Sequence, residues 1–204
     1  MSVKSPIFEK TYQNYLTRIG SLDLNALQDK LGIQVSRGRA IITFFGKPYT
    51  VSANGIDGPG GKKPHLSISV ILCKYLLMCP ESEAGEADWV SFKDFKDAAP
   101  LIHAFATTVT DPISRMFSGR PWALEKAGKK IGGYTPAEIF SYDVSIKFDV
   151  LPKVPLLLLF NDKDEEFPAQ CSVLFERRIE KYLDMECVAM VGMLLYNYLS
   201  DLSR

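Results

Sequence analysis

Residues 150–175 read VLPKVPLLLLFNDKDEEFPAQCSVLF, and this stretch decides the fold. Residues 154–160 form an apolar run that is too short for a buried helix and that two prolines accompany. Such a run is typical of a central strand that is covered on both faces. The polar residues 161–166 (NDKDEE) predict a turn, and residues 167–175 predict the returning strand of a hairpin.

The segments on either side of this hairpin extend the same structure. Residues 142–150 alternate imperfectly between apolar and polar side chains, which predicts a half-buried strand before the central one. Residues 176–184 are charged and predict a turn or a short helical segment. Residues 185–202 are apolar around most of a helical circumference, so we expect a helix that packs against the sheet.

The first part of the chain adds a second group of strands and the remaining helices. Residues 33–52 contain short apolar runs separated by glycine-containing turns, which predicts an antiparallel meander. Residues 6–31 predict two helices separated near Gly20, the second capped by Ser21 and ended by Gly32. Further helices are predicted over residues 66–79 and, in two pieces, over residues 99–131.

These patterns together predict one α+β domain that spans residues 1–204. Its mostly antiparallel sheet is built from residues 33–52 and 142–176 and is packed with apolar helices. The length suits a single domain. Residues 81–88 (ESEAGEAD) predict an acidic surface loop.

The charge balance and the apolar runs exclude two classes of partner. Lysine and arginine total 24, and so do aspartate and glutamate, so no basic field exists to attract the phosphates of a nucleic acid. The longest uncharged apolar run, residues 187–196, is far shorter than the roughly 18 residues that a membrane span needs. The first ten residues lack the apolar core of a signal peptide. We therefore expect a cytoplasmic protein without a membrane span.

The four cysteines are scattered and form no CxxC pair, so the chain has no self-contained iron–sulfur motif. Their apolar neighbours predict buried, reduced thiols, and no cofactor is indicated by the residues themselves. The four residues are Cys73, Cys79, Cys171 and Cys187.

The acidic turn is the main candidate for a functional site. Alternating carboxylates in a short loop suit a hard cation, but the glycine and the distal glutamate of an EF-hand loop are absent. A solvated turn that protects a sheet edge is the alternative. Pro168 indicates an edge, a bulge or a bend there, and such features often turn side chains toward a site. We therefore predict that Asp164, Glu165 and Glu166, together with Glu176, line a ligand pocket or a partner surface.

Two further stretches carry charge or glycine in a pattern that a ligand could use. Residues 53–64 (ANGIDGPGGKKP) resemble a phosphate-binding loop in composition, but Gly61 stands where a P-loop has lysine, which favours a flexible connection. His65 follows and could cap a helix or serve as a ligand. A lysine cluster in the last turn of a predicted helix either compensates the helix dipole or forms an anion site. Its members are Lys126, Lys129 and Lys130.

No arrangement of a nucleophile and a base is visible in the sequence. His65 and His103 are the only histidines, and neither a GxSxG nor an HExxH motif occurs. Hydrolysis by a pair of carboxylates is conceivable, but the sequence does not fix their separation.

Several motifs together resemble one family. They are WVSF at residues 89–92, GGY at 132–134, Asp-Val-Ser at 143–145, LPKVPLLLLF at 151–160 and DEEFPAQCSVLFE at 164–176, followed by an apolar C-terminal helix. The chain resembles an uncharacterised prokaryotic domain family, found mainly in anaerobic bacteria and archaea, of which some members carry a separate iron–sulfur module. The most specific features are Asp164 to Ala169 and Leu174-Phe175. The family's LFD pattern here ends in Glu176, which moves the carboxylate.

The resemblance implies no reaction, so three functional classes stay open. The first is an accessory or binding module, with a protein partner, in a metallocofactor or redox system of an anaerobe. The second is an enzyme that uses Asp164, Glu165 and Glu166, with or without a divalent metal. The third is a subunit-interaction protein that uses the hairpin and the C-terminal helix. We expect the first.

Overall fold

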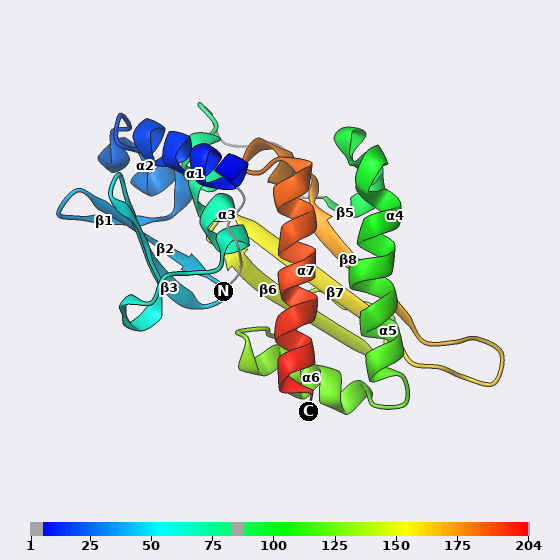
Figure 1. Cartoon of the computed structure of the whole chain (residues 1–204). Coiled ribbons are helices and arrows are strands. Elements are labelled where there is room, and N and C mark those ends of the chain that lie inside the picture. Colours follow the sequence, from blue (N-terminus) through cyan, green and yellow to red (C-terminus); the bar gives the residue numbers. More distant parts are fainter. Residues whose placement is uncertain (1–5, 83–87, 204) are drawn as a thin grey trace.

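The computed structural model describes residues 6–82 and 88–203, with residues 6–8 described by their backbone alone. The α+β fold predicted from the sequence is confirmed, with helices packed on antiparallel strands (Figure 1). The strands form two four-stranded sheets. The N-terminal sheet has the order β1-β2-β3-β4, and the C-terminal sheet has the order β5-β8-β7-β6.

The bounds of the elements follow the chain. The α-helices are α1 (Pro6–Ile19), α2 (Leu24–Leu31), α3 (Leu66–Leu77), α4 (Ile102–Phe105), α5 (Asp111–Phe117), α6 (Pro121–Lys130) and α7 (Met185–Leu202). The strands are β1 (Gln34–Ser36), β2 (Arg39–Phe44), β3 (Lys47–Ser52), β4 (Gly55–Asp57), β5 (Trp89–Ser91), β6 (Val144–Leu151), β7 (Val154–Asn161) and β8 (Gln170–Glu176). Short 3₁₀ turns are η1 (Pro59–Gly61), η2 (Phe92–Asp94), η3 (Lys96–Leu101) and η5 (Arg177–Lys181), and η4 (Ala106–Thr110) is a π-helical turn.

The apolar run near residue 157 forms β7, which lies between β6 and β8 in the C-terminal sheet. Every residue of β7 except the last is buried, as the unbroken apolar pattern predicts. One face of this sheet carries α4, α5, α6 and α7 (Figure 1). Phe105 packs edge-on against Phe175 of β8, and Gly128 of α6 lies against Ile146 of β6. The main apolar core therefore lies between this helical layer and the sheet.

The two sheets are joined through Phe45, which follows β2. Its ring lies edge-on to Phe148 of β6 and to Tyr198 of α7, at centroid distances of 6.1 and 5.4 Å. Its backbone N–H donates to the carbonyl of Val150 at 3.0 Å. Residues 33–52 and 142–176 thus supply most strands, as expected, but in two sheets that meet at one core.

Helix ends show which capping residues the chain uses. The prediction of Ser21 as a cap is wrong: the carboxylate of Asp23 accepts from the N–H groups of Asn25 and Ala26, so α2 begins after Asp23. Gly32 ends α2 in the left-handed conformation, as predicted. Of the acidic loop expected over residues 81–88, residues 83–87 lie outside the described residues. Within the described ranges no helix is both long and apolar enough to cross a bilayer.

Candidate functional site

The predicted acidic turn is the first part of a longer loop, residues 162–169, that connects β7 to β8. The returning strand begins at Gln170, although we expected it from residue 167. The difference has a local cause, because the Asp164 carboxylate accepts from the N–H groups of Glu166 and Phe167 at 2.8 and 2.7 Å. This closes a turn that engages the Phe167 amide, and Pro168 has no amide to offer to a ladder.

The base of this loop is fixed to two other parts of the chain. Asp162 accepts from the N–H of Gly119, in the turn between α5 and α6, at 2.6 Å. The N–H of Asp162 donates to the Asp143 carboxylate, just before β6, at 2.7 Å. Apart from a Ser-Gly turn at residues 118–119, no sequence pattern predicts these anchors, because a partner 43 residues away leaves no local pattern.

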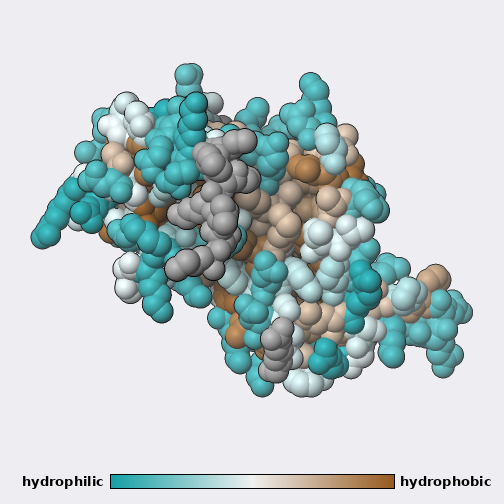
Figure 2. Space-filling model, in the orientation of Figure 1, coloured by the Kyte–Doolittle hydropathy of each residue, from teal (hydrophilic) through white to brown (hydrophobic). Residues whose placement is uncertain are grey.

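The outer part of the loop is held by its own bonds and is open to solvent. The hydrogen bonds from the Phe167 and Glu166 amides keep the pKa of Asp164 below its usual range. Glu165 and Glu166 are exposed, and within the described residues neither side chain has an ion pair or a hydrogen bond. Phe167 is 58% exposed. The loop projects from the body of the molecule beyond α5 (Figure 1), and its surface is mostly hydrophilic with a small apolar patch (Figure 2).

Glu176, the fourth predicted acidic residue, lies away from this loop. It ends β8, whereas the loop joins the first residue of that strand, so the strand separates them by roughly 20 Å. The residue is 6% exposed, and its carboxylate accepts from the guanidinium of Arg178. The structure therefore brings Asp164, Glu165 and Glu166 together and places Glu176 in a separate, paired environment.

The lysine cluster is exposed on the last turn of α6. Lys126, Lys129 and Lys130 all face solvent, and Lys129 forms a loose pair with Glu125 at 3.7 Å. Cations at this position complement the carbonyl end of the helix. This arrangement fits the dipole interpretation of the cluster.

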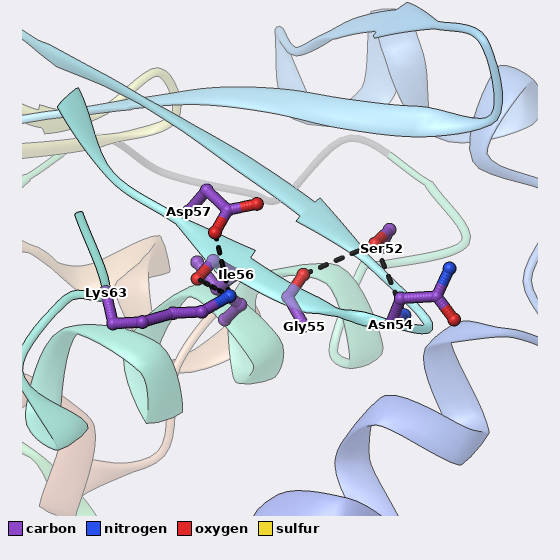
Figure 3. Close-up of polar contacts among 6 residues, drawn as sticks. All are labelled: Ser52, Asn54, Gly55, Ile56, Asp57 and Lys63. Atoms are coloured by element: carbon purple, nitrogen blue, oxygen red, sulfur yellow. Dashed lines mark hydrogen bonds and ion pairs between the residues drawn. The ribbon is translucent and has the colours of Figure 1, made fainter. Parts of the chain in front are cut away.

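The glycine-rich stretch borders a cavity of about 430 Å³ between α1, the β3–β4 turn and the start of α3. The Lys63 ammonium donates to the Asp57 carboxylate at 2.7 Å and to the carbonyl of Ile56 at 3.4 Å; Figure 3 shows both contacts. The N–H groups of Gly58 and Gly61 donate to carbonyls within the same loop. A phosphate would therefore compete with Asp57 for Lys63 and with carbonyls for the amides of Gly58 and Gly61, which favours the interpretation of this stretch as a connection.

His65 and the cysteines have structural roles. His65 caps α3, since its Nδ1 accepts from the N–H of Ser67 at 3.3 Å. All four cysteines are free, and burial raises the pKa of Cys73 to about 12. In the part of the chain that the structure describes, no three histidine, cysteine or acidic side chains are grouped closely enough to hold a metal ion.

An exposed tryptophan near the loop was not predicted as a site residue. Trp122, in the first turn of α6, is 65% exposed and follows Gly119 by three residues. Because Gly119 holds the base of the loop through Asp162, Trp122 and Phe167 are carried by connected segments at one end of the molecule. A single tryptophan beside a proline carries no sequence signal of exposure.

Comparisons with known proteins place the chain in a family without assigning it an activity. A family model described as a domain of unknown function (DUF3786) matches residues 23–198. No protein with a curated description and no solved structure shows significant similarity. The match covers most of the chain and includes β1 to β8, the acidic loop and most of α7. The chain belongs to the DUF3786 family.

Proposed function

We propose that this chain is an accessory module that binds a protein partner through the acidic loop at residues 162–167. The observation that carries the proposal is the geometry of that loop. Asp162 and Asp164 use their carboxylates to hold the backbone, and Glu165, Glu166 and Phe167 are left exposed on a projecting, ordered segment. A recognition loop that is ordered before binding loses less conformational entropy when it binds.

The residue types at this end of the molecule support a protein partner. Trp122 and Phe167 are among the most exposed large apolar side chains of the described residues. Aromatic side chains are enriched at protein–protein interfaces and often supply most of the binding energy. Glu165 and Glu166 would then steer a partner with a basic surface.

The same geometry argues against the alternative of a divalent-cation site. Calcium takes six to eight oxygen ligands and magnesium demands a near-octahedral set. In the loop, Asp162 and Asp164 already accept main-chain N–H groups, so Glu165 and Glu166 are the carboxylates left without a partner within the loop. Two adjacent exposed side chains form a poor cation cage but a good contact surface.

The proposal also concerns the kind of system to which the partner belongs. We infer that the partner belongs to a redox or metallocofactor system of an anaerobe, and the resemblance of the chain to a family of which some members carry a separate iron–sulfur module supports this. The inference implies that the metal is held by the partner, because the described carboxylates, thiols and imidazoles form no ligand cluster.

The test compares complexes recovered from the source organism under anaerobic conditions. Tagged wild-type protein is cross-linked and purified beside a variant carrying Glu165→Gln, Glu166→Gln and Phe167→Ser, and the recovered partners are quantified by mass spectrometry. A matched control carries Lys126→Gln, Lys129→Gln and Lys130→Gln, which changes three exposed residues elsewhere.

The proposal expects one stoichiometric partner, about tenfold less of it with the loop variant, and full recovery with the lysine control. Equal recovery with the loop variant and the wild type would overturn it. Iron, cobalt or a visible absorption band in the recovered complex would support the metallocofactor setting. A colourless, metal-free complex would count against that setting and leave partner binding in place.

A further inference from the structure

The register of the C-terminal sheet shows which way the backbone of β8 points. Tyr134 and Lys147 exchange two backbone hydrogen bonds, of 2.9 and 2.8 Å, so Lys147 faces the outer edge of β6. Hydrogen bonding alternates along antiparallel strands, and the registers carry this alternation across β7. The N–H and C=O groups of Ser172 and Leu174 therefore bond to β7, and those of Cys171 and Val173 point away from it.

The opposite edge of β8 gives the same result independently. The N–H of Arg177 donates to the carbonyl of Asp88 at 2.9 Å, which places Arg177 on the side of β5. Counting back by twos along an antiparallel pair, Phe175, Val173 and Cys171 face that side as well. Phe175 is opposite Val90 of β5, so its edge groups have a neighbour.

β5 covers only half of this edge. It pairs with residues 174–176 of β8 and then turns away. The turn is set by a capping box in which the N–H and Oγ of Ser91 both donate to the Asp94 carboxylate, at 3.0 and 2.6 Å. Within the described residues no strand lies beside residues 170–173, and no described group bonds to the outward N–H and C=O of Cys171 and Val173.

A mostly apolar groove of about 240 Å³ lies along this uncovered edge. Phe92 stacks on Phe105 at a centroid distance of 4.3 Å and forms one wall. Cys171 contributes to the groove from β8, and burial raises the pKa of its thiol, so it lines the groove as a small apolar side chain. Unpaired strand edges beside apolar pockets are the sites at which extended peptides add a strand to a sheet.

We propose that residues 170–173 of β8 take up one extended segment of a partner protein, antiparallel to β8, in the space where β5 would have continued. An apolar side chain of the segment enters the groove beside the stacked rings of Phe92 and Phe105. The segment then runs toward the acidic loop, so the residues that follow the apolar one are basic. This deepens the proposed function, on which it rests, because it names the segment that accompanies contact with the loop.

Charge determines the direction and the kind of occupant. Residues 162–166 carry four acidic side chains and one lysine at the end of the edge where β8 begins, and Lys93 lines the groove at the other end. An antiparallel segment has its C-terminal side beside the loop, so basic residues at that side face the acidic loop and lie away from Lys93. A second copy of this chain is disfavoured, because both copies would bring the same acidic loop to a four-residue edge.

The test uses a synthetic peptide and the purified full chain. The peptide has eight residues, with threonine and valine alternating over the first four and lysine and arginine over the last four, and both ends are capped. Two control peptides carry glutamate in place of the basic residues, or the basic half first. Binding is followed by fluorescence anisotropy and the oligomeric state by light scattering.

Three variants separate the edge from the loop. Cys171→Pro removes an outward N–H and no bond to β7, and Ala106→Phe fills the groove without altering β8. The third variant combines Glu165→Gln with Glu166→Gln. Circular dichroism and thermal unfolding establish that each variant is folded, and Ala106→Phe serves alone if the proline variant does not fold.

The proposal expects the peptide with its basic residues in the second half to bind the wild type more tightly than either control peptide does. The same peptide should bind Cys171→Pro and Ala106→Phe about tenfold more weakly than it binds the wild type. Unchanged affinity in the edge variants, with loss in the loop variant, would overturn it and leave the proposed function standing. No preference among the three peptides would also overturn it. A dimer that Cys171→Pro abolishes, without peptide binding, would overturn it in favour of a second copy as the occupant.

Discussion

The two outer edges of the C-terminal sheet are treated differently. At the β6 edge, Tyr134 pairs with Lys147 through two backbone hydrogen bonds, and its hydroxyl donates to Asp149 at 3.0 Å. At the β8 edge, β5 stops after three residues, and among the described residues no strand lies beside residues 170–173 of β8. Within one sheet, the chain therefore pairs the middle of one outer edge through the bridge between Tyr134 and Lys147 and leaves half of the other edge open.

Proteins usually protect open edges with charges, prolines, bulges or a covering segment, because an unprotected edge recruits other strands. The open residues 170–173 (QCSV) contain neither a charge nor a proline. The charges and the proline lie instead in the neighbouring loop, residues 162–169. An edge with acidic side chains at one end and unpaired backbone groups along its length favours a partner of complementary charge over indiscriminate strand pairing. This difference between the edges is what the following experiments test.

The largest expected effect is in amide hydrogen exchange along β8. Ser172 and Leu174 donate to β7, whereas Cys171 and Val173 face the open edge. We expect the first two amides to exchange at least about a hundredfold more slowly than the other two, measured by NMR in deuterated buffer. Equal protection of all four amides would mean that the β8 edge is covered, and the contrast with β6 would fail.

The covered edge should be sensitive to a single methyl group at Gly133. A Cβ there would lie 2.6 Å from both Ile146 and Phe148, so Gly133→Ala forces the segment before Tyr134 away from β6. We expect a loss of about 2 kcal/mol in the free energy of unfolding, measured with urea, and faster exchange of the Lys147 amide.

Gly38→Ala is a comparison in which the added methyl group meets no neighbour. Gly38 has a positive φ but nothing within 4 Å of an added Cβ, so the control reports backbone strain alone, which costs about 1 kcal/mol. If Gly133→Ala costs no more than Gly38→Ala, close packing of this segment does not secure the β6 edge.

The contrast between the edges also shows how far the sequence could lead. The sequence identifies β7 and β6 because burial leaves a direct pattern in each. Burial on both faces gives the unbroken apolar run of β7, and burial on one face gives the alternation of β6. β5 has three residues, too few for any period, and which strand it pairs with depends on contacts about 85 residues away. The open edge is defined by where β5 ends, so no local pattern could reveal it.

The acidic residues were located in the same partial way. The structure places Asp164, Glu165 and Glu166 on one loop, and their role as a site stays a prediction. Their different roles depend on which carboxylate meets a backbone amide, and that is decided by the turn. The prediction also included Glu176, but seven residues of extended strand carry it to the far end of β8.

A smaller effect is expected from the capping box that turns β5 away from β8. Hydrogen bonds from Ser91 keep the pKa of Asp94 below its ordinary value of 3.8. A carboxyl whose pKa is lowered by folding stabilises the protein above its unfolded pKa, and the contribution is lost as the pH falls through the folded pKa. Asp94→Ala should therefore cost about 1 kcal/mol or less at pH 7 and nothing in strong acid.

Urea unfolding of the wild type and Asp94→Ala at pH 7 and at successively lower pH measures this difference. Asp97→Ala is the control, since Asp97 is an exposed aspartate three residues along that is not part of the capping box. A cost that persists unchanged in acid would show that the carboxylate of Asp94 is not what ends β5.

The smallest expected effect on global stability comes from the loop beside the open edge. Asp164→Ala removes the acceptor of the Glu166 and Phe167 amides, and Asp164→Asn retains a side-chain oxygen that can accept both. We expect neither variant to change the urea midpoint measurably, because the loop is exposed and its base is held by Asp162. In the alanine variant alone, the Glu166 and Phe167 amides should lose their protection from exchange.

Since folding lowers the pKa of Asp164, the wild type should lose the same protection only as the pH falls through that lowered pKa. If the two amides exchange equally in the wild type and in Asp164→Ala, the loop is not ordered before binding, and the open edge would then lie beside a flexible acidic segment.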